Sequence, residues 1–237
     1  MNFRGFRHIV ILILIGMFTG TIPVYARELK VIVLDPGHGG SDSGVKGLSG
    51  IQEKGITLIL AKKLALALQE RMGVRVVLTR DEDETLSVYQ RTGVANNQKA
   101  DLFISLHVNG DFSPHRTGMQ IYTLAAGDYT GPGGDSPPEA LAWESAQNEF
   151  FLQSQQVAQA IYEQASRSSL IQNCQLRQAP LLVLKGAHLP ACLIELDYMS
   201  SKSAEERLLT GEYQAELVRV ICEGLMDYQD SLSGWRI

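Results

Sequence analysis

Short apolar runs alternate along this chain with segments of helical periodicity, and this alternation constrains the fold more than any other feature. The runs, which are rich in aliphatic and β-branched residues, occur at 31–35, 74–78, 102–107, 119–124, 181–184 and 191–196. Such runs are typical of buried strands. Strands that alternate with helices predict an α/β fold, with a single mixed but mostly parallel sheet that is flanked by helices on both faces.

The helical segments are recognised by apolar residues spaced three and four apart. In the first, at 53–72, residues such as Ile56, Leu60 and Leu64 form one stripe. Further helices are expected at about 86–99 and at about 139–167 with a break near 149. A capping box from Ser203 to Glu206 predicts the start of the last helical segment, in which Val218, Ile221, Cys222 and Leu225 face inward.

The first residues have the pattern of a secretory signal. Arg4 and Arg7 precede a nearly continuous apolar stretch at 9–18, and Val24-Tyr25-Ala26 is a small-x-small cleavage pattern. The sequence therefore predicts a signal peptide at 1–26 and one exported domain at 27–237, with no stable membrane span after cleavage. The alternative is an uncleaved amino-terminal anchor. Both interpretations predict an exported domain, in the periplasm or outside the cell at the wall.

Charge and cysteine content exclude several classes of protein. The formal net charge is −5, and it becomes −7 once Arg4 and Arg7 are removed with the signal peptide. An acidic exported domain is poorly suited to bind nucleic acid or anionic lipid. The three cysteines are too few and too scattered for a disulfide framework or a cysteine zinc site. Cys192 and Cys222 are expected in the core, and one disulfide remains an open alternative.

Residues 125–138 are rich in Gly, Pro, Asp and Ser, and they interrupt the strand–helix alternation. We expect residues 125–153 to form a loop or helical excursion from the domain. No dinucleotide fingerprint, Walker loop, Gly-x-Ser-x-Gly elbow or His-Glu-x-x-His helix is found in the sequence.

Four side chains with metal or proton chemistry are expected at one edge of the sheet. His38 lies in the glycine-rich loop after the first strand, His107 ends the third strand, and Glu195 lies near the end of the last. Glu53 lies in the first helical turn on the inward stripe, where the helix dipole alone would favour a carboxylate. Ligands collect beyond the carboxyl ends of parallel strands. Two imidazoles and one carboxylate make a catalytic zinc set, and a second carboxylate can act as general base.

Several short motifs occur in a fixed order along the chain. They are Leu-Asp-Pro-Gly-His-Gly-Gly-Ser-Asp-Ser-Gly at 34–44, Glu53-Lys54, Leu-Thr-Arg at 78–80 with Asp83, Arg91 with Ala95-Asn96, Ala-Asp-Leu-Phe-Ile-Ser-Leu-His-Val-Asn at 100–109, and Leu-Pro-Ala-Cys-Leu-Ile-Glu at 189–195. With these motifs the sequence resembles the type-3 family of zinc-dependent N-acetylmuramoyl-L-alanine amidases, which cleave peptidoglycan. The resemblance covers most of residues 30–228.

The resemblance implies a cofactor, a substrate and a set of site residues. Zn²⁺ would be held by His38, Glu53 and His107, and Glu195 would be the catalytic glutamate that acts on peptidoglycan. Four further residues are expected to contact substrate or to support the ligands: Asp35, Arg91, Asn109 and Asp197. Asp35 either braces the loop that holds His38 or binds the second ring nitrogen of that histidine. Arg91 ties helix to sheet or contacts substrate, and Asn109 binds substrate or the Glu195 region.

Two departures from the family pattern leave alternatives open. The glutamate is followed by Asp-Tyr-Met-Ser-Ser at 197–201 instead of a Gly-Phe-Leu-Ser-Asn run. This puts substrate preference and rate in doubt. Some members of the family carry an insert that covers the zinc until a protein activator removes it. Residues 125–153, with Leu141, Trp143 and Phe150, occupy that place, or they form a helix packed on the sheet. The alternative functions are a non-catalytic peptidoglycan-binding or regulatory protein and an exported zinc peptidase.

Overall fold

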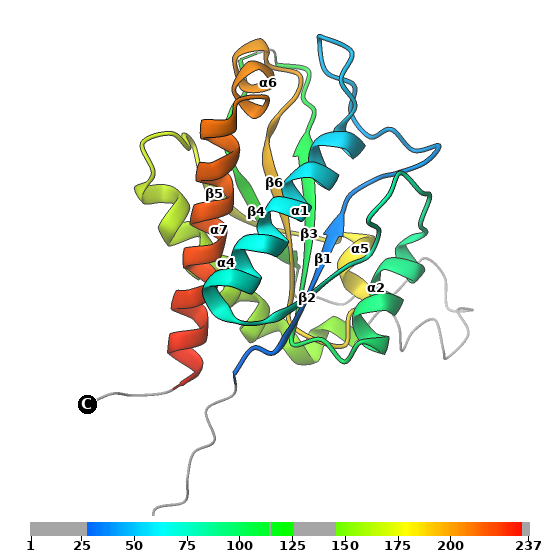
Figure 1. The fold of residues 1–237 in the computed structure, drawn as a ribbon, viewed down its shortest axis with the longest axis vertical. Coiled ribbons are helices and arrows are strands. Elements are labelled where there is room, and N and C mark those ends of the chain that lie inside the picture. The colour runs from blue at the N-terminus through cyan, green and yellow to red at the C-terminus, as the bar shows by residue number, and fades with distance from the viewer. Residues whose placement is uncertain (1–27, 114, 126–145, 234–237) are drawn as a thin grey trace, which may run out of the picture.

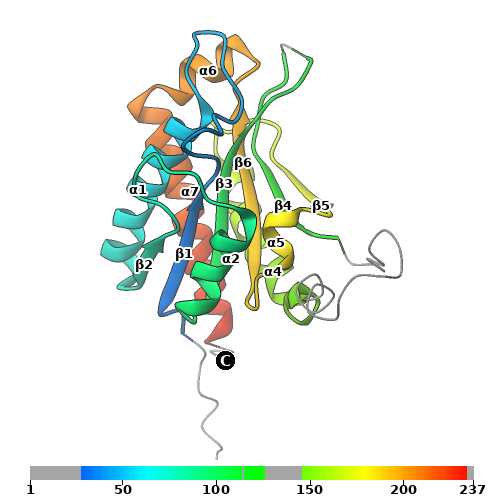
Figure 2. The same cartoon turned by 90° about the vertical axis from the view of Figure 1, so that its right-hand side faces the viewer.

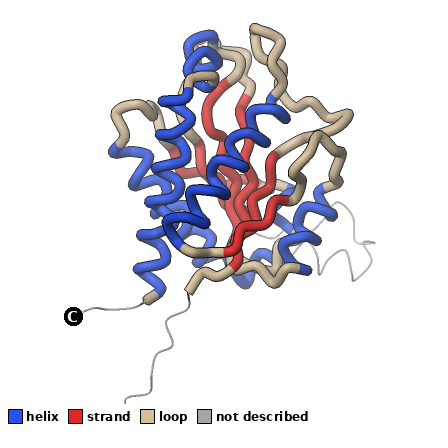
Figure 3. The backbone as a smooth tube through the Cα atoms, in the orientation of Figure 1, coloured by secondary structure: helices blue, strands red, loops and turns tan. Residues whose placement is uncertain are grey.

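The chain folds into a single sheet between two layers of helices (Figures 1 and 3). The computed structural model describes residues 28–113, 115–125 and 146–233. The predicted signal peptide and the excursion residues Leu141 and Trp143 lie outside these residues. None of the helices within the described ranges is long and apolar enough to cross a membrane.

The sheet has six strands in the order β2-β1-β3-β6-β4-β5. Their bounds are Val31–Pro36 (β1), Arg75–Leu78 (β2), Leu102–Asn109 (β3), Gln120–Leu124 (β4), Gln175–Ala179 (β5) and Ala191–Tyr198 (β6). Strands β1, β2, β3 and β6 are parallel, β4 is antiparallel to β6, and β5 is parallel to β4. The predicted mixed, mostly parallel sheet is thus confirmed. Because β4 and β5 run the other way, they begin at the edge where β3 and β6 end.

The helices lie in two layers. Their bounds are Glu53–Met72 (α1), Val88–Asn97 (α2), Ala146–Phe150 (the 3₁₀ helix η1), Phe151–Arg167 (α4), Leu182–Lys185 (α5), Lys202–Leu208 (α6) and Gly211–Leu232 (α7). Figure 2 shows α1 and α7 on one side of the sheet and α2 and α5 on the other, and α4 packs along α7. Helices on both faces confirm the predicted layer architecture.

Most of the core lies on the face covered by α1, α4 and α7. Most of its buried side chains are aliphatic, and they alternate along the strands, as Ile32 and Leu34 do on β1 and Ile104 and Leu106 do on β3. The opposite face has a smaller cluster that includes Val33, Phe103 and Leu193. On this face, polar side chains occupy the region near the carboxyl ends of β3 and β6.

Local signals in the sequence fix several helix ends. Gly73, in the left-handed region with φ 67°, ends α1 and donates its N–H to Gln69 O. At the start of α2, Ser87 and Gln90 form a reciprocal capping box. The side chain of Thr210 accepts the N–H of Tyr213 at the start of α7.

Two expectations about local structure are wrong. Residues 181–184 are not a strand, since residues 182–185 form the short helix α5, and the strand of this region is β5. A short apolar run does not distinguish helix from strand, and β5 escapes detection because it is a largely exposed edge strand. The capping box at Ser203 is also wrong, because α6 already begins after Ser201, whose side chain makes no capping bond.

Candidate metal centre and active site

Two histidines and a glutamate meet where β1 and β3 end and α1 begins. His38 lies just past β1, His107 is near the end of β3, and Glu53 is the first residue of α1. One ligand atom from each of the three side chains lies within 4.8 Å of the others. The sheet topology therefore brings together three residues that are far apart in the sequence.

Glu53 is at the centre of this cluster. Its Oε1 lies 2.9 Å from His107 Nδ1 and accepts the N–H of Val108, and its Oε2 lies 3.1 Å from His38 Nε2 and accepts the N–H of Val45. The side chain is only 2% exposed. Burial opposes its ionisation, but hydrogen bonds to and charges on the two histidines prevail and lower the pKa of Glu53 to about 2. The carboxylate is therefore ionised at neutral pH.

His38 is oriented by a carboxylate in its own loop. Its Nδ1 lies 2.8 Å from Asp42 Oδ2, which leaves Nε2 directed at Glu53. Burial disfavours the charged ring, but Glu53 and Asp42 together raise the pKa of His38 to about 9. Sequence reasoning missed Asp42 and assigned Asp35 as the alternative partner of this ring nitrogen. A carboxylate four residues after His38 in one glycine-rich loop was the available signal.

The loop after β1 adopts a conformation that glycine makes accessible. His38 itself has φ 61°, and Gly39 and Gly40 also have positive φ. A Cβ atom at Gly37 would lie 2.4 Å from His107 Cε1. Glycine at 37 therefore lets the loop approach the His107 ring closely.

Asp35, on β1, braces the loop that carries His38. The side chain is fully buried, its Oδ1 accepts from Thr79 Oγ1 at 2.6 Å and from Arg91 Nη1 at 2.8 Å, and its Oδ2 accepts from Ser105 Oγ at 2.7 Å. Arg91 also donates to His38 O at 2.8 Å. Of the alternatives for Asp35 and Arg91, these contacts favour bracing the loop.

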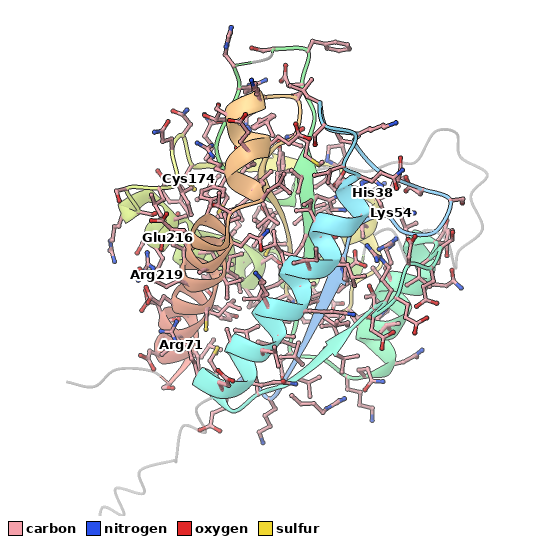
Figure 4. The ribbon with its side chains drawn as sticks, turned by 45° about the horizontal axis from the view of Figure 1, so that its top comes forward. His38, Lys54, Arg71, Cys174, Glu216 and Arg219 are labelled. Atoms are coloured by element: carbon pink, nitrogen blue, oxygen red, sulfur yellow. The ribbon has the colours of Figure 1, made fainter. Side chains whose placement is uncertain are left out.

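Two basic side chains complete the support of the loop. Arg80 is 1% exposed and donates to Pro36 O at 3.0 Å and to Gly37 O at 2.9 Å. Lys54 donates to Gly40 O at 2.8 Å and to Asp83 Oδ2 at 2.7 Å. Figure 4 shows His38 and Lys54 in the same region, near the start of α1. The position of His38 is thus set by several polar contacts.

Glu195 lies on β6 next to His107 of β3 in the strand register. Its Oε2 is buried and has no hydrogen-bond partner among the described residues. Burial, supported by the nearby negative charge of Glu53 and opposed by the two histidines, raises the pKa of Glu195 to about 7. A carboxyl group with such a pKa can take up and release a proton near neutral pH.

Of the two residues for which substrate contact is predicted on and after β3, Asn109 lies near Glu195 and Asp197 does not. Asn109 Nδ2 is 3.4 Å from the side-chain oxygen of Gln120, the residue paired with Glu195 across β4 and β6. This places Asn109 in the Glu195 region, as one of its predicted roles requires.

Asp197 makes its hydrogen bonds away from the metal cluster. It is fully buried, and its carboxylate accepts from Gly118 N, Arg207 Nε and Tyr213 Oη at 2.7–2.8 Å. None of these partners belongs to the metal cluster. A register shift between β3 and β6 accounts for the placement: His107 pairs with Glu195 but Asn109 pairs with Tyr198, so β6 has one extra residue there. The contacts give Asp197 a structural role and no free oxygen for substrate.

The other two histidines in the described ranges and the three cysteines take no part in the cluster. His115 and His188 are exposed, and Cys174, Cys192 and Cys222 are free thiols. The open alternative of a disulfide is therefore not realised in the structure. Cys192 and Cys222 are buried in the core, as expected.

The donor set fits a catalytic zinc ion. Two imidazoles and one carboxylate are common ligands of such sites. Asp42 on the second nitrogen of His38 and the backbone N–H groups on Glu53 are the outer contacts that usually orient ligands. The fold and the cluster together define an α/β protein with a candidate metal-dependent hydrolase site.

Comparison with known proteins identifies the family. The family model described as N-acetylmuramoyl-L-alanine amidase matches residues 32–227, and the chain belongs to this family. The chain is 28% identical over 218 residues to the amidase AmiC of Escherichia coli O6:H1, a match that covers 84% of this chain and 52% of AmiC. The chain thus spans about half the length of this curated relative.

Two solved structures have a similar fold. The catalytic domain of the amidase CwlV from Bacillus (Paenibacillus) polymyxa var. colistinus aligns with a TM-score of 0.69 at 28% identity, over 85% of this chain and 99% of that one. The amidase AmiC2 of Nostoc punctiforme aligns with a TM-score of 0.67 at 30% identity, over 85% and 97% of the two chains. The described domain therefore corresponds to nearly the whole of both solved chains.

Proposed function

We propose that this chain is an exported zinc-dependent amidase that hydrolyses the amide between N-acetylmuramic acid and L-alanine in peptidoglycan. The observation that carries the proposal is the position of Glu195, a carboxyl group with an unpartnered oxygen and a pKa of about 7, beside the cluster of His38, Glu53 and His107. Membership of the amidase family supports the choice of reaction and substrate.

The proposed roles follow from the contacts of each side chain. His38, Glu53 and His107 would hold the zinc ion, which when bound polarises a carbonyl group and lowers the pKa of water from about 15.7 to about 7. Asp42 and Asp35 keep His38 and its loop in position. Glu195 takes the proton of the attacking water and delivers it to the nitrogen of the leaving L-alanine, so that the amine departs neutral.

The cellular setting is part of the proposal. The amino-terminal pattern at 1–26 supports export to the periplasm or the cell wall, with residues 27–237 as the mature catalytic domain. A protein activator that acts on residues 125–153 stays a prediction. Deleting residues 126–145 tests it, because an inhibitory segment predicts a higher basal rate in the deletion variant and unchanged turnover contradicts it.

Digestion of purified sacculi tests the function itself. The zinc-loaded chain is expected to release stem peptides with new amino-terminal L-alanine, and His38→Ala, Glu53→Ala or His107→Ala is expected to lose the metal and the activity together. Binding to sacculi without release of peptides would support the non-catalytic alternative. Cleavage of ordinary peptide bonds at a comparable rate would support the peptidase alternative.

A further inference from the structure

A row of polar side chains crosses the sheet from the metal cluster to the open edge. In the strand register His107 of β3 pairs with Glu195 of β6, Glu195 pairs with Gln120 of β4, and Gln120 pairs with Gln175 of β5. Residues paired in register project from the same face of a sheet. The row therefore continues the candidate active site over β4 and β5, on the face with the smaller apolar cluster.

Arg177 lies next to the end of this row. It is exposed on β5, pairs with Tyr122 of β4, and folds back so that its Nε and Nη2 lie 3.1 and 2.5 Å from Gln175 Oε1. Tyr122 in turn donates to Gln120 Oε1 at 2.6 Å. Burial raises the pKa of the Tyr122 phenol, and the charges of Arg177 and Glu195 both act on it. In the strand order β6-β4-β5, Arg177 and Glu195 lie on the two strands that neighbour the strand of Tyr122.

The guanidinium of Arg177 has no carboxylate partner among the described residues. Other arginines have such a partner, since Arg91 pairs with Asp35 and Arg116 pairs with Asp111. Arg75 at the far edge of the sheet resembles Arg177 in contacting a glutamine oxygen, that of Gln98. A guanidinium held in a fixed orientation by an amide oxygen and lacking an anion is suited to bind a carboxylate.

The direction of the row matches the side on which the peptide leaves, and this step rests on the proposed function. A general acid stands on the side of the leaving group, so the stem peptide extends from Glu195 away from the metal cluster, over β4 and β5. Adjacent strands are about 4.8 Å apart, so β5 lies roughly 10 Å from β6. An extended peptide covers about 3.3–3.6 Å per residue. Arg177 is therefore within reach of the first two or three residues of the stem peptide.

We propose that Arg177, held by Gln175, binds a carboxylate of the stem peptide in the two or three residues beyond the scissile amide. The ligand class is an acidic peptide, and the group read is a free carboxylate as opposed to its amide. Arg177 is in this view a specificity-determining residue that favours one chemical form of the substrate.

The test compares two muramyl peptides that differ at one group. Two peptides are offered to the zinc-loaded chain and to Arg177→Gln: N-acetylmuramoyl-L-alanyl-D-glutamate with its γ-carboxyl group blocked as the amide, and the same peptide with its α-carboxyl group also converted to the amide. The chain should prefer the acid by about 5- to 10-fold in kcat/KM, as expected for an exposed charge-assisted contact. Arg177→Gln should remove the preference by slowing only the acid, and Arg177→Lys should restore part of it. Equal rates on both peptides, or equal slowing of both, would overturn the proposal.

A matched control and a second readout keep the outcomes distinct. Arg75→Gln removes an arginine that likewise donates to a glutamine oxygen, that of Gln98, but on β2 at the far edge of the sheet. It should leave the preference unchanged. If neither muramyl peptide is cleaved, the proposed function fails, and binding decides the role of Arg177. NMR titration with L-alanyl-D-glutamate γ-amide and with its α,γ-diamide should then show weaker binding of the peptide with the free α-carboxylate alone in Arg177→Gln, and equal binding in both proteins rejects that role.

Discussion

Asp35 and Glu195 are acidic residues near the ends of parallel strands in one sheet, and their surroundings are opposite. The carboxylate of Asp35 accepts hydrogen bonds from Thr79, Ser105 and Arg91. Glu195 has a buried oxygen with no partner among the described residues, and its pKa is raised to about 7. A buried carboxylate with all its hydrogen-bond partners stabilises the fold. A buried carboxyl group without them lowers stability, but its raised pKa suits it to proton transfer near neutral pH.

The largest effect is expected at Glu195. Replacing it in Glu195→Gln or Glu195→Ala should lower kcat by about 10²- to 10⁴-fold, because a positioned acid–base group is lost. Zinc content, measured by elemental analysis, should stay at the wild-type level. The free energy of unfolding of the metal-free protein at neutral pH should not fall in Glu195→Gln and should rise by up to about 2 kcal/mol, since a neutral amide replaces a carboxyl group whose ionised form is destabilised by burial. A near-normal rate would show that the assigned role is wrong.

Asp35 should behave in the reverse way. Asp35→Ala leaves the buried guanidinium of Arg91 without its counter-charge, which is expected to cost about 3–5 kcal/mol of folding free energy in urea denaturation. Activity per folded molecule should fall less than in Glu195→Ala, because Asp35 acts on the site only through Arg91 and the loop that holds His38. A variant that is fully stable but inactive would remove the distinction between the two carboxylates.

Replacing Asp42 is expected to affect the metal site and leave the stability of the fold unchanged. Its carboxylate is exposed and contacts a ring nitrogen of His38, so Asp42→Ala should leave stability nearly unchanged. Zinc affinity, measured by competition with a chelator, should drop about 10- to 100-fold, as is typical when an outer partner of a ligand is removed. Unchanged affinity would mean that the loop alone orients His38.

The smallest effect is expected from removing a single donor to Asp35. Ser105→Ala takes away one of its hydrogen bonds and leaves Thr79 and Arg91 in place. The expected loss is about 1–2 kcal/mol of unfolding free energy, with zinc content and rate per folded molecule unchanged. A loss as large as that of Asp35→Ala would indicate that the network acts as one unit.

The sequence was sufficient to predict the layers of the fold and the convergence of His38, Glu53 and His107, because the ends of parallel strands meet at one edge. Asp42 escaped prediction since its contact depends on the positive φ of His38 and its neighbours. Strand β5 escaped because an exposed edge strand carries no apolar pattern.

Asp197 shows a different limit. Strict alternation places residues 195 and 197 on one face, and only the register shift in β6 separates them. An extra residue in a strand depends on its partner strand and leaves no periodic signal in the sequence.

This irregularity divides β6 into two independent parts. Up to Glu195 the strand contributes to the candidate active site on one face of the sheet. From Asp197 onward it anchors α6 and α7 through hydrogen bonds from Arg207 and Tyr213. Side chains that are almost adjacent in the chain are therefore insulated from each other. We expect substitutions at the anchoring end of β6 to change stability without changing the proton transfer that is proposed for Glu195.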